Sequence, residues 1–255
     1  MLHAAAKNGN IESIKLLLSQ GFDIDSRDRE GITPLMHTAL NGQQGAFQML
    51  IKNGADLSFK DIDGFSLLHS AAQGGNTSII KKLLSLGLDV DSTDNDGRSP
   101  LMSAAFYGKQ NAFHMLLQNG ADPSLKTNSG STLLHKAAQG GNPSIINKLL
   151  SLGLDINSRN NGGVTPLMSA AFAGEQNAFH MLLENGADPS LKTNNGSSLL
   201  HKAAQGGNTS IINVLLSLGL HIDLEDINGK TPLIRAKEKS NSDTVKFLIS
   251  KGARS

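Results

Sequence analysis

A period of 33 residues runs through the sequence and constrains its fold more than any other feature. Glycine recurs at this interval without an insertion, at Gly31, Gly64, Gly97, Gly130, Gly163, Gly196 and Gly229. Periods of this length are typical of arrays in which each unit buries its apolar face against its neighbours. The 255 residues are therefore expected to form one array of about eight units. Chain length does not predict the number of domains in such an array.

Within each period, the residues predict a pair of short helices. A Ser or Thr two residues after the glycine is a helix N-cap, and in alternate periods a proline follows it, as in Thr33-Pro34. A second glycine such as Gly42 closes this helix, and apolar residues at helical spacing predict another helix that ends at a glycine, as at Gly87. Polar segments such as residues 89–97 suit turns that project as hairpin-like fingers.

These residues resemble the ankyrin repeat. Thr33-Pro34-Leu35 and its equivalents look like the family's T-P-L-H-x-A, and Gly54-Ala55-Asp56 resembles its G-A-D after the second helix. The resemblance implies an all-α repeat solenoid of helix-turn-helix units with projecting β-hairpin fingers. It covers essentially the whole chain as a single ankyrin repeat domain. Its approximate repeats are residues 1–30, 31–63, 64–96, 97–129, 130–162, 163–195, 196–228 and 229–255.

The repeats depart from the family pattern in a regular way, because two types alternate. Repeats with the proline carry Met or Ile where the family has His, whereas the intervening repeats keep His69, His135 and His201 but replace the proline by leucine. Residues 97–129 and 163–195 differ at only six of 33 positions, so the repeating unit is a 66-residue pair. In residues 229–255, added charge predicts a soluble C-terminal cap.

Composition excludes several functional classes. The chain has no Cys, which rules out disulfides and thiolate metal sites, and its formal charge of +1 gives no general affinity for nucleic acid. No apolar run approaches the roughly 18 residues of a membrane helix, and the first residues lack the pattern of a secretory signal. We therefore expect a cytoplasmic protein without membrane insertion.

Candidate metal and phosphate sites fail because their spacing or their residue types do not fit. The histidines that recur every 66 residues would lie roughly 16–20 Å apart, too far to share zinc, and are expected to bridge helix starts and finger backbone. The acidic segment 89–97 fails the calcium-loop register, which would put Ser92 at its first ligand position. The Gly229-Lys230-Thr231 segment has Leu224 where a phosphate loop needs glycine. No catalytic trio stands out either, so we expect no enzyme, cofactor or metal.

The resemblance implies a non-catalytic module that binds a partner protein or peptide through the concave face of the first helices and the finger tips. The variable positions there supply the candidate binding residues, aromatic anchors first and a basic flank last: Phe65, Phe106, Tyr107, Phe172, Leu40, Arg98, Lys136, Lys202 and Arg235. Two alternatives stay open. Phe106 and Phe172 could instead fill the core, and the array could be a structural or elastic spacer, or a targeting part of a larger enzyme or effector. We expect a monomer. If the first repeat is an artificial truncation, Leu2 and neighbouring apolar atoms could drive weak end-to-end association.

Overall fold

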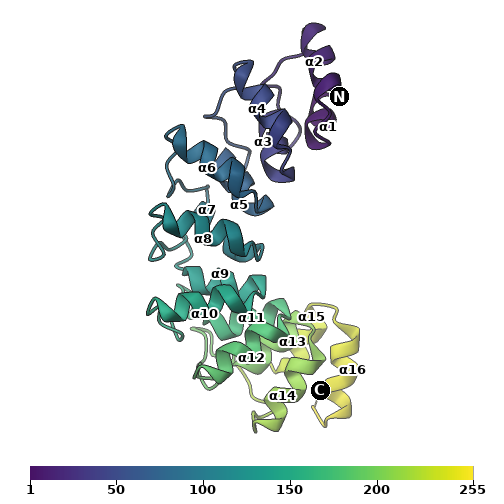
Figure 1. Cartoon of the computed structure of the whole chain (residues 1–255). Helices are drawn as coiled ribbons and strands as arrows, with labels where there is room; N and C mark the ends of the chain where they lie inside the picture. The colour runs from purple at the N-terminus through teal and green to yellow at the C-terminus, as the bar shows by residue number, and fades with distance from the viewer. Residues whose placement is uncertain (255) are drawn as a thin grey trace. The chain divides into compact units, whose positions relative to one another are not determined.

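The computed structural model describes residues 1–254, which form sixteen α-helices and no strand (Figure 1). The helices come in eight consecutive pairs, which confirms the predicted all-helical array. The chain divides into two compact units, residues 1–128 and 129–255, and each is described by itself. Strand pairing in the fingers and a single-domain organisation stay predictions.

The first unit contains the first eight helices. They are α1 (Leu2–Lys7), α2 (Ile11–Ser19), α3 (Pro34–Asn41), α4 (Gln44–Lys52), α5 (Leu67–Gly74), α6 (Thr77–Ser85), α7 (Pro100–Phe106) and α8 (Gln110–Gln118). The odd-numbered helices pack on one another in chain order, as do the even-numbered helices. The unit therefore has two layers of helices. The aromatic rings of Phe47 and Phe113 are fully buried between them.

The second unit repeats this arrangement with the next eight helices. They are α9 (Leu133–Gly140), α10 (Pro143–Ser151), α11 (Pro166–Ala173), α12 (Gln176–Glu184), α13 (Leu199–Gly206), α14 (Thr209–Ser217), α15 (Pro232–Glu238) and α16 (Ser242–Ser250). Here too the odd-numbered and the even-numbered helices each pack in order. Phe179 occupies the buried position that Phe113 fills in the first unit.

Each odd-numbered helix after α1 begins at a polar cap that the sequence predicts. Thr33 accepts a hydrogen bond from the backbone N–H of Met36 at 3.3 Å, and Pro34 occupies the first helical position. In the alternate repeat type, Ser66 and His69 form a capping box instead. The caps satisfy backbone donors that the first helical turn leaves free, so the alternation changes the capping chemistry and keeps the helix start.

The segments between helix pairs end in tight turns that are linked from repeat to repeat. In one such turn, the N–H of Asp94 donates to the carbonyl of Arg98 at 3.0 Å, and Gly97 adopts a φ of +77°. The N–H of Asn95 at the tip donates to the carbonyl of Asp63 in the preceding turn at 2.9 Å. One backbone bond of this kind per repeat fixes the turns as a row beside the odd-numbered helices.

Candidate functional site

In the first unit, the predicted binding residues fall into two rows set by the repeat. Phe65 and Arg98 follow the turn glycine of successive repeats, whereas Leu40 and Phe106 occupy equivalent positions near the ends of α3 and α7. Tyr107 directly follows Phe106. The structure therefore groups these five residues as a turn row and a helix-end row rather than as one cluster.

The turn row is held together by contacts within the chain. The guanidinium carbon of Arg98 lies 5.1 Å from the ring centroid of Phe65, within range of a cation–π interaction. Arg98 also forms ion pairs with Asp94, at 2.5 Å from Nε to Oδ2, and with Asp96, at 3.2 Å. The Asp94 side chain is fully buried, so Arg98 first of all neutralises this carboxylate.

The helix-end row exposes an aromatic pair. Phe106 and Tyr107 are 41 % and 43 % exposed, and their rings meet edge to face with centroids 5.1 Å apart. The core position in the same repeat is taken by Phe113, which is fully buried on α8. Leu40, in contrast, is half-buried. The exposure of Phe106 does not fit the reading as a buried core residue, and its role as a binding anchor stays a prediction.

In the second unit, the candidates again lie on the odd-numbered helices. Lys136, Lys202 and Arg235 are each the fourth residue of their helix, in α9, α13 and α15. All three are half-buried. Phe172 lies near the end of α11 and is 44 % exposed, while Phe179 supplies the buried ring of that repeat. Among the candidate binding residues of the second unit, one is an exposed aromatic ring and three are half-buried cations.

Arg235 is the centre of an ion-pair network in the last repeat. Its guanidinium pairs with Asp226, whose side chain is fully buried, and with Glu238 at 3.0 Å. Glu238 is also paired with Lys230. Burial alone would raise the pKa of Asp226, but hydrogen bonds from Arg235 and from the backbone N–H groups of the turn lower it below its usual value.

Lys202 differs from Arg235 because no carboxylate accompanies it. Its side-chain ammonium group has no hydrogen-bond or ion-pair partner within residues 1–254, although its backbone N–H donates to the carbonyl of Ser198. Burial, followed by the positive charge of Arg235, lowers the pKa of Lys202 below its usual value. A half-buried cation in this situation is stabilised by any negative charge that approaches it.

A comparison with protein families accounts for the whole arrangement. A model for ankyrin repeats, made of three copies of the repeat, matches residues 1–61, 46–127, 123–193 and 185–255. The chain belongs to the ankyrin-repeat family. Ankyrin repeats are in general protein–protein interaction modules and are typically non-catalytic. Comparison with curated proteins finds no match.

The recurring histidines of this ankyrin protein have the structural role that the sequence predicts. His69 Nε2 lies 2.8 Å from the carbonyl oxygen of Arg98 in the next turn, while Nδ1 lies 2.8 Å from the hydroxyl of Ser66. Because a carbonyl only accepts, Nε2 carries the proton in the neutral ring. His201 makes the same contacts with Lys230 and Ser198. Within residues 1–254, no group of three or more His, Asp or Glu side chains is arranged to hold a metal ion.

Sequence reasoning missed the turn carboxylates that hold the two arginines. Asp94 and Asp226 occupy equivalent turn positions, and each accepts two backbone hydrogen bonds while pairing with an arginine. The available signal was the aspartate four residues before Arg98. This spacing alone does not predict the ion pair, because the partner of a turn residue depends on the conformation of the turn.

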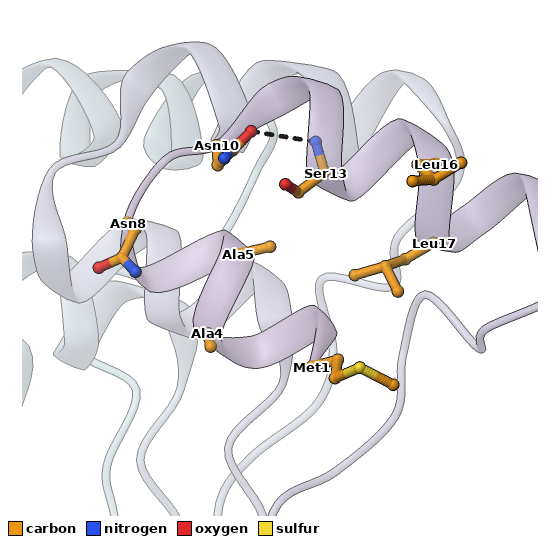
Figure 2. Close-up of a pocket in the computed structure, with 8 residues that line it drawn as sticks. All are labelled: Met1, Ala4, Ala5, Asn8, Asn10, Ser13, Leu16 and Leu17. Carbon is orange, nitrogen blue, oxygen red and sulfur yellow. Dashed lines mark hydrogen bonds between the residues drawn. The ribbon is translucent and has the colours of Figure 1, made fainter.

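The first repeat has an apolar depression of about 430 Å³ (Figure 2). Ala4 and Ala5 line it from α1, Met1 lines it from just before α1, and Leu16 and Leu17 line it from α2. Leu2, the predicted source of end-to-end association, is only 1 % exposed and so contributes little apolar surface there. Met1 and Leu16, at 81 % and 58 %, are the exposed apolar residues there instead.

In the described part of the chain, every helix is too short or too polar to cross a membrane.

Proposed function

We propose that this ankyrin array is a non-catalytic recognition module that binds a partner protein or peptide through its odd-numbered helices and the adjoining turns. The observation that carries the proposal is the exposed Phe106–Tyr107 pair at the end of α7. Aromatic side chains are enriched among residues that dominate binding energy, because they bury a large area for a small loss of conformational entropy.

The position of this pair supports recognition over a role in packing. Phe113 already fills the core of the repeat, so the stability of the fold does not require a second large ring on the other side of α7. Tyr107 is replaced by Ala173 at the equivalent position of the second unit. A residue that the fold allows to vary between nearly identical repeats is available for partner specificity.

A quantitative pull-down from cell extract tests the proposal with the wild-type chain and a Phe106→Ala, Tyr107→Ala double variant. The matched control is Phe22→Ala, because Phe22 is a comparably exposed ring, at 39 %, that lies outside the odd-numbered helices. Loss of an anchor pair is expected to weaken capture of a specific partner by about tenfold or more, which corresponds to about 1.4 kcal/mol.

The control variant should capture the same partner as the wild type, and all three chains should melt alike because the replaced rings are exposed. Arg98 is left unchanged, since its removal would leave the buried Asp94 carboxylate without its counter-charge. Equal capture by the double variant, or no specific capture by the wild type, would contradict the proposal and favour a structural spacer.

A further inference from the structure

Four residues in the second unit form a row across neighbouring helices. Lys136, Ser169, Lys202 and Arg235 are each the fourth residue of α9, α11, α13 and α15, and these helices pack in that order. Residues at the same position of successive repeats share one face of the array. Phe172 lies three residues after Ser169, so it is on the same side of α11, about one turn away.

The end of this row around Lys202 and Arg235 has more positive than negative charge. Arg235 engages both Asp226 and Glu238, and Glu238 also pairs with Lys230. The Lys202 ammonium group has no carboxylate partner of its own, and the nearby charge of Arg235 adds to the burial that lowers its pKa. The Nε–H of Arg235 is buried and also makes no hydrogen bond. An incoming carboxylate at Lys202 would supply the counter-charge that the chain itself does not provide.

The spacing of the row limits the shape of a ligand. Packed helices lie about 8–10 Å apart, which places Lys136 and Lys202 about 16–20 Å apart across α11. An extended peptide advances about 3.3 Å per residue, so five to six residues span this distance. Between the two lysines lies the small Ser169, with the exposed ring of Phe172 beside it.

We propose that Lys136, Lys202 and Phe172 bind an extended acidic segment of a partner protein, in which two carboxylate side chains about six residues apart flank a large apolar side chain. The inference rests on the proposed recognition function and names the chemistry of the partner. A protein segment fits better than a nucleic acid, because the small Ser169 and the ring of Phe172 separate the two lysines, whereas a nucleic acid carries a continuous series of phosphates that an unbroken basic track would match.

A defined peptide tests this proposal. The probe is a fluorescein-labelled Gly/Ser peptide with two glutamates six residues apart and a leucine midway, and its binding to the full chain is followed by fluorescence anisotropy. We expect saturable binding that weakens as salt is added. Replacing both glutamates by glutamine should weaken it by about tenfold or more, since each charge-assisted hydrogen bond is lost.

Two protein variants with the same change in net charge locate the site. Lys202→Met should weaken binding by about tenfold, while it leaves folding intact because methionine fills the half-buried space without a charge. Lys246→Met, on the exposed surface of α16, should change the affinity less than about twofold. Phe172→Ala should also weaken binding of the leucine peptide, by about fivefold or more.

Three results would overturn the inference: no saturable binding up to about 1 mM peptide, equal affinity for the glutamate and glutamine peptides, or displacement of the peptide by an equimolar single-stranded oligothymidylate. These failures are separate from failure of the recognition function. If the Phe106→Ala, Tyr107→Ala variant loses its captured partner while the peptide does not bind, the array is a recognition module for another class of segment.

Discussion

The repeat that begins at Gly97 and the last repeat place different residues at the same four positions. Arg98, Ser103, Phe106 and Gly108 of the former correspond to Lys230, Arg235, Glu238 and Ser240 of the latter. In both repeats an arginine neutralises a fully buried turn aspartate. In the former the arginine comes from the turn, and in the latter it comes from the helix.

The origin of the arginine decides what each repeat presents to solvent. Because Arg98 approaches Asp94 from the turn, the helix position is free to be the small Ser103, and an exposed aromatic pair follows it on α7. Because Arg235 approaches Asp226 from the helix, Glu238 takes the place of the aromatic ring and completes an ion-pair network. One requirement of the fold thus permits either an aromatic surface or a charged one.

Removal of the helix arginine should have the largest effect on this comparison. Arg235→Ala leaves Asp226 buried without its cation, which is expected to cost about 3 kcal/mol. Urea denaturation measures the loss, and amide hydrogen exchange should show it first in α15 and α16. Lys239→Ala is the control, since Lys239 is exposed and its loss should be nearly neutral. Equal effects of the two substitutions would mean that the network does not stabilise the last repeat.

The backbone after the helix should give a smaller effect with the opposite sign. Ser240 has a φ of +57°, where the former repeat has Gly108 at +63°. A side chain in this left-handed conformation costs energy, so Ser240→Gly should stabilise the chain by about 1 kcal/mol. Ser250→Gly, within α16, should instead destabilise it. The melting temperatures of the two variants test this, and a loss of stability in Ser240→Gly would refute the strain argument.

The hydroxyl of Ser103 should give a still smaller gain when it is removed. Its oxygen is buried and makes no hydrogen bond within residues 1–254. Ser103→Ala removes this unsatisfied group and is expected to stabilise the chain by about 0.5 kcal/mol. At the same position of the preceding repeat, Ser70 donates to the carbonyl of Ser66, so Ser70→Ala should bring no gain. A destabilised Ser103→Ala variant would indicate that the hydroxyl has a partner in solution.

The smallest effect near neutral pH should come from the two histidines of the preceding repeats, which contact the turns of the two compared repeats. Burial is the main cause that lowers the pKa of His69 and of His201 below the usual 6.5. Below pH 6.5 the unfolded chain therefore binds protons that the folded chain does not, so stability falls as the pH is lowered. Urea midpoints between pH 7.5 and 5.5 measure this slope, and His69→Gln should flatten it. A midpoint that rises toward acid pH would contradict the burial argument.

The sequence predicts the helices because their signals are local. A cap such as Thr33 followed by Pro34 acts within one turn, and the period repeats the same signal along the chain. The bridging role of His69 also follows from its fixed place in the repeat. These features need no knowledge of which side of a helix faces the core.

The exposure of Phe106 and the partner of Arg98 depend on packing and could not be assigned from the sequence. A large ring near a helix end can turn toward either side, and only the position of Phe113 shows that the core is already filled. Several aspartates precede Arg98 in the sequence, and the turn conformation selects Asp94 and Asp96 as its partners. The position of Lys202 was predicted, but its lack of a counter-charge emerges only from the surrounding helices.

In alternate repeats a second glycine directly precedes the one that ends the odd-numbered helix, and the two glycines have different tasks. Gly75 adopts the left-handed conformation that ends α5, with a φ of +80°. Gly74 is still helical, and a Cβ atom there would lie 2.1 Å from the carbonyl oxygen of Leu40 in the preceding repeat. Gly206 meets the carbonyl oxygen of Phe172 in the same way, at 2.2 Å.

Because of this close approach, the two repeat types cannot exchange places. A repeat with asparagine, tyrosine or alanine at that position, as at Asn41, Tyr107 and Ala173, cannot take the place of one with glycine. Excision of a single 33-residue repeat would join two repeats of one type and lose a fitted junction, whereas excision of 66 residues would restore the original neighbours. The array can therefore gain or lose length without a mismatched junction only in steps of two repeats.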